Sequence, residues 1–327
     1  MKNKGKINNI QILRAIAALN VVIFHCIGGA ASYNFSTPYT QFLKGWGANG
    51  VDLFFVISGF IMIYTGQNSR SSPSKFFVKR IFRIVPVYWA LTLLWVTILL
   101  LLPTLLRSAQ FDFGKTLASL FFLTGPIYND TPALYVGWTL EFEFLFYTFF
   151  AMSMFVKDHR LSQILLLIAV FASPLLVPQL DKIMFEFAYG MIVALIIMSK
   201  KISFRTSWVC LIAGILFLCG TIGNAEVAKA GREIYWGLPA TLIVAGAINI
   251  KQIQNKILLF LGNASYSIYL VQVFTIPATL KVLTLILPSN YGDFTIIICT
   301  LVTILIGAIS YQYIERPSYR WLVKKFP

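Results

Sequence analysis

The stretch IQILRAIAALNVVIFHCIGGA, residues 10–30, decides the fold class of this chain. As a helix it would be about 30 Å long, which matches the hydrocarbon core of a bilayer. Its ionisable side chains, Arg14 and His25, are eleven positions apart, so about three turns separate them and both point to nearly one face. Ionisable groups inside a membrane span usually face a protein interior or a water-filled cavity. The pair therefore predicts a cavity along this helix; the alternative is a snorkelling arginine and a hydrogen-bonded core histidine.

The composition extends this interpretation to the whole chain. Of its 327 residues, 58% are hydrophobic and 12% are charged, and the mean hydropathy is +0.76. Soluble domains carry about 25% charged residues. We therefore expect an all-α, polytopic membrane protein that forms one membrane domain over residues 1–327, without a separate soluble domain. The net charge of +15 lies in short loops between apolar runs, which indicates membrane topology rather than nucleic-acid binding.

Apolar windows of about 20 residues predict about ten membrane-spanning helices. They cover residues 8–28, 47–65, 83–103, 135–156, 161–178, 182–199, 207–223, 235–250, 256–279 and 292–313. A shorter apolar stretch, 115–127, is expected to be interfacial or re-entrant. Ten spans place both termini on one side, and that side holds 19 of the 27 Lys and Arg residues against seven on the other. Cytoplasmic loops carry the positive excess, so we expect both termini in the cytoplasm.

Other features limit the chemistry. The first apolar run follows several lysines, as in a cleaved signal peptide, but Arg14 and His25 inside the run argue against cleavage. The chain has two histidines, too few for a multi-histidine metal site, so no metal is expected. The four cysteines lie in apolar segments without metal-like spacing, and we expect them to be small buried hydrophobic residues.

The predicted orientation places three ionisable groups at similar depth. His25 lies in the outer half of the first span, Asp52 near the outer end of the second, and Glu143 below the outer end of the fourth. Each could be a satisfied structural group, but together they favour a site. At the cytoplasmic entry to the third span, Lys79, Arg80 and Arg83 form a basic patch on one helix. This patch suits an anionic ligand, because arginine binds phosphates bidentately, although any cytoplasmic loop is basic.

These residues resemble the acyltransferase 3 family of integral membrane acyltransferases, in particular its exopolysaccharide O-acyltransferase branch. The resemblance covers essentially the whole chain. It rests on Arg14 and His25 with ten residues between them, followed by GVDLFFVISGF (50–60), KRIFRIVPVYW (79–89), WTLEFEFLFY (138–147), LGNASYSIYLVQ (261–272) and IERP (314–317). Two departures stand out. Family members often have histidine where this chain has Gln272, and some carry a C-terminal extracytoplasmic hydrolase-like domain. This chain ends shortly after IERP, so its membrane part is expected to complete the transfer itself or to pass the acyl group to a separate protein.

The resemblance implies transfer of an acyl group, usually acetyl from acetyl-CoA, to a hydroxyl of a glycan or glycolipid. Acetyl-CoA is then a co-substrate, and no bound cofactor is expected. The residues suit this chemistry, because a sugar hydroxyl needs a base and histidine titrates near neutral pH. We expect His25 to be that base, with Asp52 or Glu143 as its carboxylate partner. Arg14, Lys79, Arg80 and Arg83 are expected to bind the CoA phosphates.

Further residues in these motifs are candidates for lining the donor or acceptor site: Ser58, Trp138, Tyr147 and Gln272. Cys26 is an alternative acyl-carrying nucleophile, although it points about 100° away from His25 on a helix. The expected partners are acyl-CoA, a glycan or lipid-linked glycan acceptor and membrane lipid, with no nucleic acid. The expected location is the bacterial cytoplasmic membrane. The rival hypothesis is a secondary transporter or flippase, because intramembrane charges also serve transport.

Overall fold

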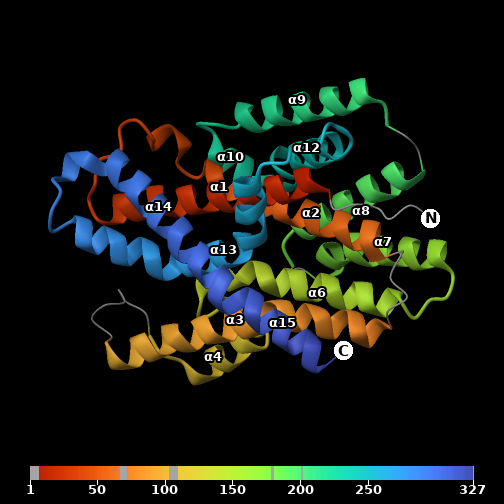
Figure 1. Ribbon diagram of the computed structural model, residues 1–327, viewed down its shortest axis with the longest axis horizontal. Helices are drawn as coiled ribbons and strands as arrows, with labels where there is room; N and C mark the ends of the chain where they lie inside the picture. Colours follow the sequence, from red (N-terminus) through yellow and green to blue (C-terminus); the bar gives the residue numbers. More distant parts are fainter. Residues whose placement is uncertain (1–6, 67–71, 103–109, 178–179, 200–201, 327) are drawn as a thin grey trace.

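A computed structural model of the chain describes residues 7–66, 72–102, 110–177, 180–199 and 202–326 (Figure 1). Throughout these ranges the backbone forms helices and turns, with no strand. The predicted all-α class is therefore confirmed. In Figure 1, helices α9 and α12 lie along one edge of the molecule, α3 and α4 lie along the opposite edge, and α1 runs between them.

Each of the ten predicted windows contains a long helix. These helices are α1 (Asn8–Ser32), α2 (Asn49–Gly66), α3 (Pro73–Leu101), α6 (Trp138–Ser153), α7 (His159–Leu176), α8 (Met184–Ser199), α9 (Phe204–Gly220), α12 (Gly237–Asn249), α13 (Lys256–Leu283) and α14 (Gly292–Ser310). Residues 103 and 178, at the ends of two windows, lie outside the described residues. Six helices of the described part are long and apolar enough to cross a membrane, which agrees with a polytopic membrane protein. The number of ten crossings and the orientation of the termini stay predictions.

Short elements connect the long helices. They are α4 (Phe113–Leu120), α5 (Thr124–Tyr128), α10 (Ala225–Ala230), α11 (Arg232–Tyr235) and α15 (Arg316–Lys325), with 3₁₀ turns at Gln41–Leu43, Trp46–Ala48, Tyr135–Gly137 and Ser289–Tyr291. The apolar stretch 115–127 folds as the two short helices α4 and α5 rather than as one segment. A five-residue π-helix, Tyr311–Glu315, joins α14 to α15.

Helix α2 lies in the interior of the bundle, since 72% of its apolar window is buried, against 22% for α7. It packs closely on α8 through two glycines. A Cβ atom at Gly59 would meet the backbone carbonyl of Phe187, and one at Gly190 would meet that of Val56. Small residues let helix backbones approach in membrane proteins. The glycine of the SGF motif therefore fixes the position of α2, and with it that of the adjacent Ser58.

Helices α1 and α13 run side by side in the same direction. Successive contacts show this: Gly262 packs on the backbone of Gln11, and Gly29 packs on Ile276. Helix α14 covers the pair, with Gly307 against Ile268. Cys26 and Cys299 are buried between these helices, as expected, whereas Cys219 is exposed on α9, contrary to the prediction of burial. The two polar motifs on α1 and α13 are thereby brought face to face.

Candidate active site

A cleft of about 800 Å³ opens among helices α1, α2, α3, α6 and α13. Six of the residues singled out from the sequence line it: Arg14, Ser58, Arg80, Arg83, Glu143 and Tyr147. Aromatic and aliphatic side chains of α2 and α13 form much of the remaining wall. The structure thus brings together residues from five helices that the sequence motifs place far apart in the chain.

The arginines of this cleft are not ion-paired to any residue that the structure describes. Throughout the described ranges, no carboxylate lies within 4.0 Å of Arg14, Arg80 or Arg83. Arg14 donates to the hydroxyl of Ser265, with distances of 3.4 Å from Nε and 3.2 Å from one terminal nitrogen. The guanidinium of Arg80 lies 5.2 Å from the ring centre of Tyr147, a cation–π contact. Buried cations are normally paired, so the cleft holds positive charge that a bound anion would neutralise.

Glu143 is the carboxylate that lines this cleft. Its Oε1 accepts hydrogen bonds from the hydroxyl of Tyr147 and, at 3.4 Å, from the hydroxyl of Ser58. Both donors were site candidates, and one helical turn separates Tyr147 from Glu143. One carboxylate cannot neutralise three guanidinium groups. The lining of the cleft therefore keeps a positive balance.

Lys79 lines a second hollow, of about 740 Å³, that continues from the cleft. Met62, Arg80 and Arg83 border both spaces. The wall of the second hollow also includes Tyr319 of α15. All four predicted phosphate-binding residues therefore lie along one continuous depression.

His25 lies outside the lining of this cleft, with its ring orientation fixed by hydrogen bonds. Its Nδ1 atom is 3.0 Å from the carbonyl oxygen of Val21 and 3.1 Å from Oε1 of Gln272. The amide nitrogen of Gln272 donates to the carbonyl of Tyr269 at 2.8 Å, so its oxygen faces the histidine. Two acceptors at Nδ1 require a proton on Nδ1. The neutral ring then carries its lone pair on Nε2, the form that accepts a proton.

The cleft and His25 are linked through one residue on α13. Tyr269 lines the cleft, and its hydroxyl donates to the carbonyl of Val136 at 2.8 Å. The neighbouring Tyr135 lies edge-on to His25, with 5.4 Å between ring centres. Tyr269 and Tyr135 thus connect the wall of the cleft to the surroundings of His25.

The position of Asp52 differs from the prediction. Both of its oxygens bind Arg232, at 3.0 Å from Nε and 2.7 Å from Nη2, and its side chain is fully buried. Glu186 of α8 is also buried and within electrostatic reach of this pair. The ring of Trp138, another candidate, lies 5.8 Å from the guanidinium of Arg232. A buried carboxylate needs a cationic partner, and Arg232 lies in the segment between the predicted windows 207–223 and 235–250.

Neither Asp52 nor Glu143 is the partner of His25. The acceptors at Nδ1 are a backbone carbonyl and an amide. Gln272, at the position where the family often has histidine, thus fills the place expected for a carboxylate. Among the residues that the structure describes, no three His, Cys, Asp or Glu side chains are grouped as a metal ion would require.

Polar residues of α13 hold the site together in a way that was not predicted from the sequence. Tyr266 donates to the carbonyl of Ile84 on α3 at 2.8 Å, and Ser267 donates to Glu315 at 2.6 Å. With Ser265 on Arg14 and Gln272 on His25, the run SYSIYLVQ contacts α1, α3 and the π-helix. Polar residues inside an apolar helix were the signal, because such groups need partners.

Glu315, the glutamate of the IERP motif, is the second such residue. It ends the π-helix and its side chain is buried. Its charge acts on both Arg14 and Arg83. Single π turns inside helices occur frequently at functional sites. The wide turn directs this carboxylate toward the bundle, a geometry that a sequence motif does not reveal.

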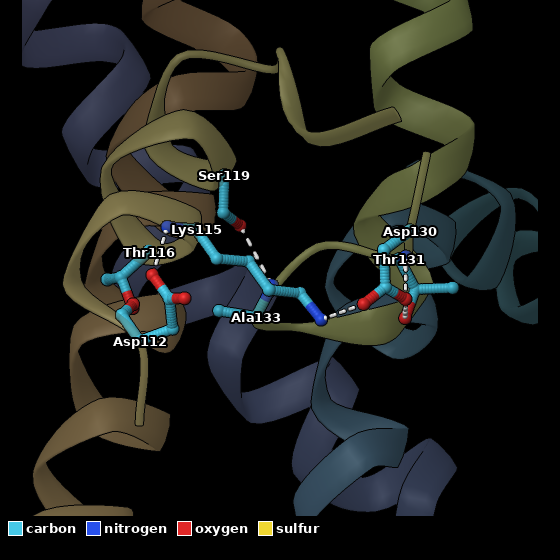
Figure 2. Close-up of polar contacts among 7 residues, drawn as sticks. All are labelled: Asp112, Lys115, Thr116, Ser119, Asp130, Thr131 and Ala133. Atoms are coloured by element: carbon cyan, nitrogen blue, oxygen red, sulfur yellow. Dashed lines mark hydrogen bonds and ion pairs between the residues drawn. The ribbon is translucent and has the colours of Figure 1, made fainter. Parts of the chain in front are cut away.

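The connection between α4 and α6 places Tyr135 beside His25. Figure 2 shows its polar contacts: the ammonium of Lys115 binds Asp130 at 2.5 Å, and the amide of Ala133 donates to Ser119 at 3.1 Å. Asp112 accepts from the backbone of Lys115 at 2.7 Å and begins α4. The bound Lys115 holds the pKa of the Asp130 carboxyl below its usual range. This connection is therefore fixed on both sides of the turn that precedes Tyr135.

Comparison with known proteins decides the family. A family model described as an acyltransferase domain matches residues 7–313, nearly the whole chain. The chain belongs to the acyltransferase 3 family. The resemblance drawn from the sequence motifs is thus confirmed, and an enzyme rather than a transporter is the class that the comparison supports.

Two related proteins illustrate the breadth of the family. The acyltransferase 3 chain is 33% identical, over 299 residues, to the exopolysaccharide production protein ExoZ of Rhizobium meliloti, covering 84% of this chain and 90% of the relative. It is 26% identical to the peptidoglycan O-acetyltransferase OatA of Listeria monocytogenes, covering 94% of this chain and 55% of that longer relative. No solved structure matches the chain significantly.

Proposed function

We propose that this protein transfers an acetyl group from acetyl-CoA to a hydroxyl of an exported polysaccharide. The acyltransferase 3 family supplies the reaction class, and the names of the relatives, an exopolysaccharide production protein and a peptidoglycan O-acetyltransferase, favour a glycan acceptor. The observation that carries the donor assignment is the cleft with three arginines, none of which has a carboxylate in ion-pair contact among the described residues. An acidic thioester such as acetyl-CoA would supply the missing negative charge.

The donor would lie along the continuous depression. Lys79, Arg80 and Arg83 would bind its phosphates, since guanidinium groups bind phosphate oxygens bidentately. Arg14 lies deeper on α1, and beyond it the wall is mostly aromatic and aliphatic, which suits the uncharged pantetheine arm. Arg14 and His25 are about 16 Å apart along the helix axis. A pantetheine arm of about the same length would bring the thioester toward His25.

In this proposal His25 is the general base. Its Nε2 takes the proton of the acceptor hydroxyl as the oxygen attacks the thioester carbonyl. The tetrahedral intermediate then expels the CoA thiolate, which takes the proton back from Nε2. One O–C bond forms, one C–S bond breaks, and the acetyl group moves from sulfur to oxygen without an acyl-enzyme. Val21 and Gln272 stabilise the protonated ring by accepting from Nδ1, the role that a carboxylate has in other acyl-transfer sites.

The direct test is substitution of the base. His25→Ala should lower the turnover of acetyl-CoA with a glycan acceptor by about 10²- to 10⁴-fold, while the purified protein still binds CoA. The matched control is His159→Ala, which removes the other histidine, an exposed residue at the start of α7. Near-normal turnover in folded His25→Ala protein would refute the assignment.

The predicted orientation adds a second test. The basic end of the depression would face the cytoplasm, where acyl-CoA is made, and His25 would lie toward the outer face. Sealed vesicles of known orientation should therefore use acetyl-CoA from the cytoplasmic side and release product on the other. Product formed with both substrates confined to the cytoplasmic side would disprove transfer across the membrane but leave the acyltransferase assignment intact.

A further inference from the structure

The hollow beside Lys79 is lined by cationic and aromatic side chains. It lies between the end of α2, the start of α3 and helix α15, and its wall includes three cations, Lys79, Arg80 and Arg83. None of the three has a carboxylate within 4.0 Å among the residues that the structure describes. The space therefore suits a ligand with more than one negative charge.

Its aromatic side chains are not equivalent. Phe76 is buried beneath Arg80, whose guanidinium lies 5.3 Å from the ring centre. Tyr319 is half-buried on α15 and makes no ring stacking, cation–π contact or hydrogen bond with any residue in the described ranges. A planar ring that borders a pocket without a partner can stack on a flat ligand group, because aromatic rings pack face to face or edge to face.

The adjoining cleft shares Arg80 and Arg83 with this hollow, and apart from Arg14 and Glu143 the rest of its wall consists of apolar and hydroxyl-bearing side chains. Cations and an available aromatic ring in the hollow, next to a mainly uncharged wall in the cleft, match the two halves of coenzyme A. One half is an adenosine with a 3′-phosphate and a 5′-diphosphate, and the other is the uncharged pantetheine arm. The inference that follows rests on the proposed function.

We infer that this hollow binds the nucleotide part of the donor, with its phosphates on Lys79, Arg80 and Arg83 and its purine ring stacked on Tyr319. Helix α15 is then part of the donor site. The π-helix Tyr311–Glu315 connects it directly to α14 and places Glu315 within electrostatic reach of Arg83. The family motif IERP therefore lies at the junction that brings Tyr319 to the basic patch.

Binding of adenosine 3′,5′-bisphosphate tests this inference without any catalysis. The ligand has the base and phosphates but no pantetheine, and inorganic pyrophosphate is the matched ligand without a base. With the full chain in lipid nanodiscs, the bisphosphate should bind at least about tenfold more tightly than pyrophosphate, the range expected for stacking of one base. Tyr319→Ala should remove that margin, and Tyr319→Phe should keep it.

The control is Trp321→Ala, which removes an aromatic ring two residues away on α15. Trp321 is 57% exposed and does not line the hollow. This variant should bind both ligands as the unmodified protein does. A margin that survives in Tyr319→Ala, in protein with unchanged thermal stability, would overturn the inference. If the hollow instead binds the phosphate of a lipid, adding phosphatidylglycerol to the nanodiscs should weaken bisphosphate binding several-fold. That result would also overturn the inference.

The nucleotide site and the proposed function can each be disproved without the other. If acetyl-CoA is consumed but the base-dependent margin is absent or does not depend on Tyr319, the nucleotide site is wrong and the proposed function stands. If the margin depends on Tyr319 but acetyl-CoA is never consumed, the nucleotide site stands and the proposed donor chemistry is wrong.

Discussion

Two groups of half-buried arginines lie in this membrane protein, and their surroundings are opposite. Arg232 is bound through two nitrogens by Asp52, and the rings of Trp138 and Trp236 cover it at 5.8 and 5.6 Å. Arg14 and Arg83 line a cleft with no carboxylate in contact within the described part of the chain. The charge of a paired arginine is already neutralised within the fold. An unpaired arginine can bind an anionic ligand, which is why the second group is the candidate binding site.

The comparison also explains why ionisable residues at matching depth were misleading. Asp52, Glu143 and His25 were expected to act together because each is a polar group in an apolar span. Asp52 belongs to the paired group, Glu143 to the cleft, and His25 to neither. Burial alone does not distinguish a structural ionisable residue from one at a candidate site, whereas the presence or absence of an ion-pair partner does.

The largest expected effect is on stability. Arg232→Met should lower the free energy of unfolding by about 3–5 kcal/mol, because it leaves Asp52 buried without its cation. The double variant Asp52→Asn, Arg232→Met should recover much of that loss, since both charges are then gone. Thermal unfolding in detergent measures both. A single variant as stable as the unmodified protein would mean that this pair is not structural and would break the comparison.

The next effect is on donor affinity. Arg83→Ala should raise the KM for acetyl-CoA by about ten- to a hundredfold, because a hydrogen bond to a charged group contributes about 1.5–3 kcal/mol. Thermal stability should change little, as no ion pair is broken. Arg83→Lys should restore only part of the affinity, since it lacks the planar fork. An equal rise in the KM for the glycan acceptor would point to a general folding defect.

A smaller effect is expected at the histidine. Gln272→Leu should lower kcat about three- to tenfold, because one of two acceptors at Nδ1 is lost while the Val21 carbonyl remains. Gln272→Glu keeps an acceptor and should retain turnover, with the base titrating at higher pH because of the added negative charge. The pH dependence of kcat distinguishes this positioning role from a packing defect. Gln312→Leu, an exposed glutamine, is the control.

The smallest effect is expected at an exposed ion pair, which contributes little to the free energy of unfolding. Asp130→Asn removes the ion pair with Lys115 and should change the free energy of unfolding by at most about 1 kcal/mol. Since the folded-state pKa of Asp130 is lowered, its contribution is present above the unfolded-state pKa and disappears as the pH falls through the folded-state value. Added salt should weaken it further. A loss comparable to that of Arg232→Met would contradict the distinction between buried and exposed pairs.

The sequence predicted the helices well because apolar periodicity and length are local properties. Each predicted window contains a helix, and the motif residues Arg14, Ser58, Glu143 and Tyr147 do share one cleft. Partners could not be predicted in the same way. Arg232 lies in a segment that reads as an outer loop, yet it folds inward onto Asp52 across 180 residues of sequence. Pairing depends on tertiary contacts, which a single sequence does not contain.

The π-helix is a second case. The sequence YQYIE does not distinguish a π-helical turn from an α-helical turn, although this turn directs Glu315 inward. In contrast, the identity of Gln272 was visible as a departure from the family pattern. Its significance became clear only when the structure placed its amide oxygen on Nδ1 of His25.

The parallel helices α1 and α13 are joined at two levels, by Arg14 with Ser265 near one end and by His25 with Gln272 near the other. Two such cross-links prevent one helix from sliding or turning against the other without breaking both. The pair therefore resists relative motion, and opening of the cleft would break fewer of these contacts if it came from helices outside the pair, such as α3, α6 and α15. Rocking of one half of the bundle against the other, the motion of an alternating-access carrier, would have to break both cross-links if the division ran between α1 and α13.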